Sequence, residues 1–264
     1  MALPTKSKPR IHPTAVVSKE AELGHGVEIG PYSIVGPQVR IGSQTRIASH
    51  VVLEGQTHLG ERCRLFPGAC IGFPAQTRAS EIVRSTVIIG NDNLFREYVT
   101  VNAGMKDGSK TIIGDRNTFM INSHVAHDCV RGSDIVIANA VALAGHVCVE
   151  DAAVIGGLAG VHQFVRIGKL AMVGGLSKVV MDVAPFSIHD GQPAKFCGIN
   201  AVGLRRGGFS SARMLPIKSA LKTLFGSRIN FERAIPKVQK EFKNNPDVYY
   251  LLEFIKNSKR GVAR

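Results

Sequence analysis

The chain has 264 residues, enough to bury the core of one long domain and to add a small second one. Lys and Arg outnumber Asp and Glu by 33 to 20, and the formal net charge of +13 indicates an acidic partner such as an anionic lipid, a phosphosugar, an acidic carrier protein or nucleic acid. No aromatic residues are interleaved with the basic ones, which argues against nucleic-acid binding, and a merely solvated basic surface is an equal alternative to any partner.

The N-terminal extension, residues 1–10, is polar and basic and lacks the apolar segment of a secretion signal. No run of about 18 apolar residues occurs in the chain, so we expect no stable insertion into a membrane. The five cysteines lack CxxC spacing, and most lie among small apolar residues, where a reduced thiol packs well. Together these features predict a cytoplasmic protein.

From Ile11 onward, a large aliphatic residue occurs at every sixth position. Gly often follows it, and a small or β-branched residue stands four positions later. A period of six matches neither an α-helix nor one long strand, and it predicts short strands joined by tight turns, with the aliphatic residue pointing inward. The first run comprises Ile11, Val17, Leu23, Ile29, Val35, Ile41, Ile47, Leu53, Leu59, Leu65 and Ile71.

The same phase resumes at Val83 and continues to Val179. Across the whole series only Thr77, Asp107 and Arg131 interrupt it. Thr77 and Asp107 lie within residues 73–84 and 103–110, which are polar or contain Gly and are expected to project as loops. Loops on a rigid scaffold are common places for binding residues.

Three hexads make one triangular coil of eighteen residues, and coils stacked about 4.8 Å apart form a prism filled with aliphatic side chains. This pattern resembles the hexapeptide-repeat acyltransferase superfamily. The resemblance implies a left-handed winding, opposite to the usual crossover rule. We therefore predict an all-β left-handed parallel β-helix over residues 11–190.

The composition changes after the repeat ends at Pro185. Helical apolar spacing appears in Ser211–Phe225 and in residues 231–242 and 246–257. Ser210 or Ser211, Asn230 and Asn245 are suitable N-caps for these helices. The sequence predicts a small α-helical domain over residues 191–264, with its helices beginning near Gly203.

Histidines gather in neighbouring repeats of the second half of the prism: His124, His127, His146 and His162. Because one coil is eighteen residues long, His127 should stack against Gly145 and His146 against Phe164. A lone histidine is more often a surface or capping residue, but these lie in coils otherwise filled with Ala, Val and Ile. Their position favours a polar site near one corner of the prism.

At these residues the chain resembles the UDP-N-acetylglucosamine acyltransferase family, which transfers a hydroxyacyl chain from acyl carrier protein to the sugar 3-hydroxyl. The similarity extends over nearly the whole chain. It is carried by residues 11–15, 124–129, 143–147, 161–164, 182–185, 198–200 and 203–206.

The resemblance implies a role for each matching residue. His127 is the expected general base, Asp128 orients it, and the N–H of Gly145 stabilises the oxyanion. The expected substrate-binding residues are His124, His146, His162 and Gln163 for the sugar diphosphate and acyl donor, Gln76 for the sugar, Asn200 and Arg206 for the nucleotide phosphates, and Gly175 for the acyl groove.

Several acceptor contacts of the family pattern are missing. The loop that reads Gln-Asp-x-Lys in the family is Gln76-Thr77-Arg78-Ala79 here, and the His-Arg-Gly stretch is Asn102-Ala103-Gly104. Val202 replaces an acidic residue, and Gly207 replaces an arginine. Each lost charged partner typically costs about 1.5–3 kcal/mol, unless residues such as Arg78, Arg84 or Lys106 compensate.

We therefore predict a cytoplasmic homotrimer that makes the first acyl transfer of lipid A biosynthesis, to the 3-position of UDP-N-acetylglucosamine. Acyl carrier protein is the expected partner, docking on basic residues near the helical domain, with no cofactor beyond this acyl donor and no metal. The alternatives are a paralogue with another UDP-sugar acceptor, a trimeric zinc carbonic anhydrase using His124, His127 and His146, and a non-catalytic scaffold.

Overall fold

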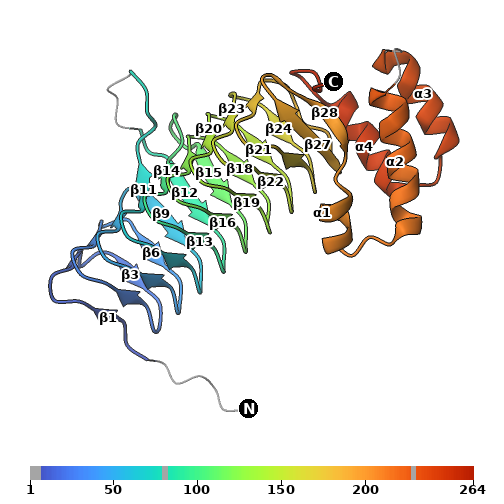
Figure 1. The fold of residues 1–264 in the computed structure, drawn as a ribbon. Helices are drawn as coiled ribbons and strands as arrows, with labels where there is room; N and C mark the ends of the chain where they lie inside the picture. Colours follow the sequence, from blue (N-terminus) through green and yellow to red (C-terminus); the bar gives the residue numbers. More distant parts are fainter. Residues whose placement is uncertain (1–6, 79–82, 227–229) are drawn as a thin grey trace.

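In the computed structural model, residues 7–78, 83–226 and 230–264 are described, and they form a three-sided prism followed by a helical domain (Figure 1). Three parallel sheets make the faces of the prism. Successive strands belong to the three sheets in turn. Each strand therefore pairs with the strand one coil away, as Arg10 pairs with Glu28 and Ile11 with Ile29. The parallel β-helix predicted from the six-residue period is confirmed, and so is the left-handed winding implied by the family resemblance.

Each sheet gathers one strand from every coil, and the strands are mostly two residues long because a tight turn follows each of them. Sheet A comprises β1 (Arg10–Ile11), β4 (Glu28–Ile29), β7 (Arg46–Ile47), β10 (Arg64–Leu65), β13 (Leu94–Phe95), β16 (Thr118–Phe119), β19 (Val136–Ile137), β22 (Val154–Ile155), β25 (Met172–Val173), β27 (Ser187–Gly191) and β28 (Ala194–Ile199). Sheet B comprises β2 (Val16–Val17), β5 (Ile34–Val35), β8 (Val52–Leu53), β11 (Cys70–Phe73), β14 (Thr100–Asn102), β17 (His124–Val125), β20 (Ala142–Leu143), β23 (Gly160–Val161) and β26 (Lys178–Val179). Sheet C comprises β3 (Glu22–Leu23), β6 (Arg40–Ile41), β9 (Gln56–Leu59), β12 (Thr86–Ile89), β15 (Lys110–Ile113), β18 (Val130–Arg131), β21 (Cys148–Val149) and β24 (Arg166–Ile167).

The aliphatic residues of the repeat fill the interior of the prism. From Ile29 to Val179 the hexad positions that lie in strands are almost completely buried, and the residue before each of them points outward. Val83, where the phase was expected to resume, is only half-buried and precedes β12. Phe95 and Phe119 stack inside with ring centroids 4.8 Å apart. Burial of this continuous apolar column is the main source of stability, since each short strand alone has too few hydrogen bonds to persist.

Arg131 occupies one of these inward positions, between Ile113 below and Val149 above. The coil keeps its geometry there, although the sequence pattern breaks. The side chain is 2% exposed, and none of its three nitrogens has a hydrogen-bond partner among the described residues. Burial lowers the pKa of the guanidinium, while the weakly accepting thiols of Cys129 and Cys148 act in the opposite direction. This residue is therefore a charge enclosed in an aliphatic core.

The antiparallel pair β27–β28 closes the end of the prism, and four helices follow it. These are α1 (Ala201–Arg206), α2 (Ser211–Phe225), α3 (Phe231–Glu241) and α4 (Pro246–Lys256). The three longer helices and their N-caps agree with the sequence prediction, because the side chains of Ser210, Asn230 and Asn245 each accept a backbone N–H of the first turn. The short helix α1 lies where the helices were expected to begin, near Gly203, but it was not predicted as a separate helix. No helix in the described segments is long and apolar enough to cross a bilayer.

A second apolar core joins the helices to the last coils of the prism. Leu170, Ala184 and Phe186 of the prism end pack with Leu204 and Phe209, which belong to the helical part. His189 of β27 is fully buried at this junction, where its ring contacts Phe196 and Phe225 and its Nε2 donates to the carbonyl oxygen of Ala263 at 3.1 Å. The C-terminal tail is thereby fixed to the prism through a neutral imidazole.

His189 makes the stability of this junction sensitive to acid. Burial lowers the pKa of His189 from the ordinary 6.5 to about 4, so between these values the unfolded chain binds a proton that the folded chain excludes. The contribution of the neutral ring is complete above pH 6.5 and is lost as the pH falls toward 4, by about 3 kcal/mol in the free energy of unfolding. We expect denaturant titrations at fixed protein concentration to show this loss in the wild type. His189→Gln, which keeps an N–H donor but does not titrate, should lack this component, and equal pH dependence of the two proteins would contradict the assignment.

Candidate active site

The histidines lie along the corner of the prism where sheet B passes to sheet C. The turn after β17 contains His127 and Asp128, the turn after β20 contains Gly145 and His146, and the turn after β23 contains Gln163 and Phe164. The two longer connections, β11 to β12 and β14 to β15, leave the prism at this same corner, along its upper edge in Figure 1. Turns of successive coils and both loops thus converge on one edge.

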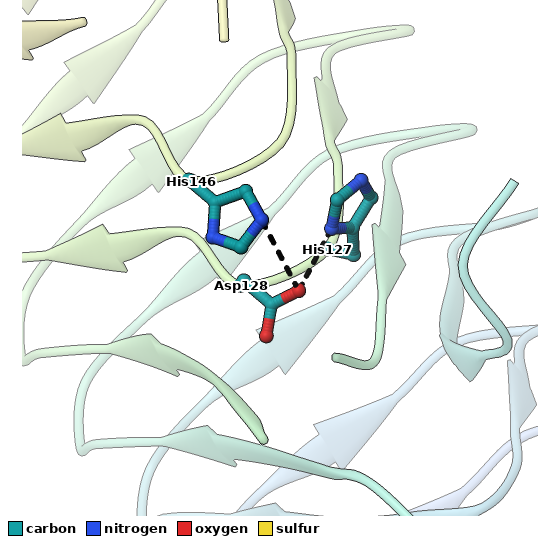
Figure 2. Close-up of side chains that lie close together, drawn as sticks. All are labelled: His127, Asp128 and His146. Carbon is teal, nitrogen blue, oxygen red and sulfur yellow. Dashed lines mark hydrogen bonds and ion pairs between the residues drawn. The ribbon is translucent and has the colours of Figure 1, made fainter. Parts of the chain in front are cut away.

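Three side chains meet at this corner (Figure 2). His127 Nδ1 and Asp128 Oδ2 are 2.8 Å apart, and His146 Nε2 lies 3.8 Å from the same oxygen. The two imidazole rings stand edge to face with centroids 5.2 Å apart. The His127 side chain is 16% exposed and the Asp128 side chain 9%, so the pair is sheltered but reachable from solvent.

The environment of Asp128 favours its ionised form. Burial works against the charge, but hydrogen bonds from His127, the N–H of Met105 and Ser109 outweigh it and hold the pKa of the carboxyl below its ordinary value. The N–H of Met105 lies 3.0 Å from Oδ2. An ionised carboxylate can only accept, so His127 donates from Nδ1 and presents a free lone pair on Nε2. That is the tautomer required of a general base facing outward.

Gly145 lies directly against the His127 ring, one coil above it, as the eighteen-residue spacing predicts. A Cβ atom at position 145 would stand 2.5 Å from His127 Nε2, closer than van der Waals contact permits. The N–H of Gly145 has no hydrogen-bond acceptor within the part of the chain that the structure describes. A free backbone donor therefore lies next to the basic nitrogen, which is the arrangement that an oxyanion formed during acyl transfer requires.

We expect Gly145→Ala to reduce turnover by about a hundredfold, because the added methyl group must displace the His127 ring from its position against the N–H of residue 145. The change should be measured as kcat with saturating substrates. Wild-type activity in Gly145→Ala would show that the contact with the ring is unimportant.

The neighbouring histidines flank this centre. His124 of β17 shares a hydrogen bond of 2.7 Å with Thr100 Oγ1, and burial, then the charges of Arg131 and His127, lower its pKa. His146 stacks on Phe164 with centroids 4.6 Å apart, as the coil spacing predicts. His162 and Gln163 are exposed on the turn above. A groove of about 420 Å³ with an almost wholly apolar lining runs along sheet B between His124 and His162.

The remaining predicted residues do not join this cluster within one chain. Gln76 is exposed on the loop after β11, and Gly175 is exposed on the turn after β25, one coil above Gly157. Arg206 is exposed at the end of α1, which Figure 1 shows apart from the corner. Asn200 is buried, and its amide caps α1 through Gly203 N and donates to the carbonyl oxygen of Leu170. Their contacts with substrate stay predictions.

Sequence reasoning missed Met105, Ser109 and Thr111, which contact Asp128 from the loop after β14 and from β15. The break in the repeat at Asp107 marked the loop, but nothing in the spacing indicated that it folds back on the carboxylate. Thr100 could have been found, because it is the strand partner of His124.

The same cluster has the composition of a possible metal site. One ligand atom each from His127, Asp128 and His146 lies within 4.8 Å of the others. These are two imidazoles and a carboxylate, a set that zinc accepts. The three imidazoles weighed for a zinc anhydrase include His124, whose Nδ1 is instead engaged by Thr100. The hydrogen bonds of Asp128 to His127 and to the loop support a proton-transfer role better.

Comparison with known proteins identifies the family. The family model described as UDP-N-acetylglucosamine O-acyltransferase, domain 2, matches residues 182–263, and the hexapeptide-repeat model matches residues 20–55. An acyl-[acyl-carrier-protein]–UDP-N-acetylglucosamine O-acyltransferase of Thermodesulfovibrio yellowstonii is 47% identical over 96% of this chain and 99% of its own length. The chain belongs to the UDP-N-acetylglucosamine O-acyltransferase family.

Other members of the family agree along almost the whole length. The Synechocystis enzyme is 44% identical, over 97% of this chain and 92% of that protein. The crystal structure of the UDP-N-acetylglucosamine acyltransferase from Bacteroides fragilis superposes with a TM-score of 0.92 at 36% identity, covering 96% of this chain and all of that one. This membership establishes an O-acyltransferase and favours acyl transfer over the zinc anhydrase alternative.

Proposed function

We propose that this protein transfers a 3-hydroxyacyl chain from acyl carrier protein to the 3-hydroxyl of UDP-N-acetylglucosamine, the first step of lipid A biosynthesis. The observation that carries the proposal is the placement of His127 Nε2 against Gly145, with Asp128 fixing the opposite ring nitrogen. The names of the relatives, which are acyl-carrier-protein-dependent enzymes, support it.

The reaction follows from this geometry. His127 Nε2 accepts the proton of the sugar hydroxyl while the hydroxyl oxygen forms a bond to the thioester carbonyl carbon. The negative charge moves to the carbonyl oxygen, where the N–H of Gly145 stabilises it. Collapse of this intermediate breaks the carbon–sulfur bond, and protonated His127 returns the proton to the departing thiolate. The step balances with no cofactor other than the acyl donor.

The surroundings of the pair provide candidate positions for the two substrates. The apolar groove on sheet B begins at His124 and has the lining that an acyl chain prefers. Exposed basic residues on α3, namely Lys237 and Lys240, with Lys243 just beyond it, give the helical domain a surface suited to an acidic carrier protein. We propose the cytoplasm as its compartment, since the five cysteines are free and carrier-linked acyl chains are intracellular substrates.

We further propose that the protein works as a homotrimer. The outer face of sheet B carries Val16 and Ile34, which are 64% and 40% exposed, followed by Val52 and, beyond the polar Thr100 and His124, by Ala142 and Gly160. An exposed apolar stretch such as that from Val16 to Val52 usually marks a protein interface. Helix α1, which ends at Arg206, lies apart from the corner in one chain (Figure 1), so the predicted contact of Arg206 with the nucleotide phosphates would require a neighbouring subunit. Sedimentation equilibrium should give three times the 28.4 kDa chain mass.

Purified protein should be incubated with 3-hydroxyacyl carrier protein and, separately, with each member of a panel of UDP-sugars. We expect release of the carrier thiol only when UDP-N-acetylglucosamine is present, and a product whose mass and fragmentation place the acyl group on the 3-oxygen. Release with another UDP-sugar alone would show that the missing acceptor contacts at Thr77, Ala103 and Gly207 have changed the acceptor. Release without any sugar, or none at all, would refute acyl transfer.

A further inference from the structure

The turns at the catalytic corner follow a rule. In each turn one residue adopts a left-handed backbone conformation, with φ of 60° at His146 and 65° at Phe164. Such a residue donates its N–H to a carbonyl oxygen of the turn one coil below, as His146 does to His127 and Phe164 does to Gly145. Because a left-handed conformation is costly for a residue with a side chain, this bond helps to hold it.

Asp128 departs from the rule. Its φ is 59°, but the turn beneath it is replaced by the loop of residues 103–109, and no carbonyl oxygen is in place to accept its N–H. The acceptor is instead the hydroxyl Oγ1 of Thr111, 2.9 Å away, from a side chain that is fully buried. At the turn that carries the catalytic carboxylate, the hydroxyl of Thr111 therefore accepts the hydrogen bond that a backbone carbonyl oxygen accepts in the neighbouring turns.

Thr111 also differs from other buried polar side chains of the repeat. Thr45 and Asn117 accept the N–H of the residue eighteen positions later, Cys63 and Ile135, which are themselves inward-facing. Thr111 instead bonds the residue seventeen positions later, in the turn. Its hydroxyl is thus directed to Asp128 and not to the inward-facing Cys129.

The carboxylate of Asp128 is held from the other side by the loop. The N–H of Met105 donates to Oδ2, and Gly104 packs so closely that a Cβ there would lie 2.9 Å from Oδ1. The loop is itself tied to residue 84, since Arg84 N donates to Asp107 Oδ1 and Gly108 N donates to the carbonyl oxygen of Arg84. The backbone and the carboxylate of Asp128 are therefore fixed by separate groups.

We infer that Thr111, together with the N–H of Met105, positions Asp128 and through it sets the tautomer of His127. This inference rests on the proposed acyl transfer only for its kinetic consequence. Without the Thr111 hydroxyl, the turn loses the bond that holds its left-handed residue, so the 2.8 Å contact between Asp128 and His127 should loosen. Thr111 touches no reacting atom and is a positioning residue.

The test is Thr111→Val, which keeps the shape of the side chain and matches its strand partner Val87. We expect kcat to fall about tenfold to a hundredfold with KM changed less than twofold. The ¹⁵N spectrum of His127 should change from the Nδ1-protonated tautomer to a mixture. Thr111→Ser, which retains Oγ, should restore both values.

Thr45→Val is the matched control, because it removes an equivalent buried hydroxyl that accepts a backbone N–H in a coil without catalytic residues. It should leave kcat and the His127 spectrum unchanged. A wild-type spectrum in Thr111→Val would overturn the inference, whatever the activity. If the wild-type protein transfers no acyl group but Thr111→Val still shows the expected change in the His127 spectrum, the proposed function is refuted and the positioning role stands.

Discussion

His127→Ala should reduce acyl transfer by about a thousandfold or more while leaving the fold intact. The imidazole lies directly against Gly145, whose N–H is free in the described chain, and its Nε2 is available because Nδ1 is bonded to Asp128. The oxyanion donor and the substrate contacts survive the change, so a small residual rate is expected. The ring lies outside the aliphatic interior, so its removal leaves no cavity in the core. The measurement is single-turnover transfer from acyl carrier protein, with circular dichroism to verify folding.

His25→Ala serves as the control, since His25 is exposed on an early coil far from the corner. It should retain the wild-type rate and melting temperature. If His127→Ala kept more than about a tenth of the wild-type rate, His127 would not be the general base. If the wild type itself were inactive, the result would favour the non-catalytic scaffold alternative.

Arg131→Met should stabilise the protein by several kcal/mol, an unusual outcome for a core substitution. The guanidinium is enclosed between Ile113 and Val149 without a hydrogen-bond partner among the described residues. Folding therefore removes its hydrogen bonds to water and provides none from the protein in their place. Methionine has a similar length, carries no charge and adapts to an irregular space. The midpoint of chemical unfolding should rise at constant protein concentration.

Arg116→Met is the comparison, because Arg116 is an exposed arginine paired with Asp134 on the surface. Loss of such a pair should cost less than about 1 kcal/mol. A lower midpoint for Arg131→Met than for the wild type would show that the buried charge has a stabilising partner in solution. The substitution leaves the hydrogen bond between His127 and Asp128 in place.

Much of the fold could be predicted because the residues that specify it are close in sequence and recur with a fixed period. A six-residue spacing fixes which side chains point inward, and an eighteen-residue coil fixes which residues stack, so Gly145 against His127 and Phe164 against His146 could be placed in advance. The helices began at their predicted caps because Ser210, Asn230 and Asn245 act on their own first turns.

What the spacing could not predict lies where the repeat is interrupted. A loop has no period, so nothing in residues 103–109 indicated that the N–H of Met105 would reach Asp128. Asn200 resembles a family phosphate-binding residue, yet its amide is engaged by α1 and by Leu170. Such contacts depend on several elements packed together, and no single stretch of the chain contains them.

By itself, then, the sequence determined the prism, the three long helices and the alignment of imidazoles along one corner, because each follows from short-range spacing. Only the tertiary structure decided how the catalytic carboxylate is held, that Arg131 lies inside the core, and which predicted ligands stand apart in one chain. The physical reason is that regular elements are specified by neighbouring residues, whereas the geometry of loops and buried polar groups is set by whatever packs against them.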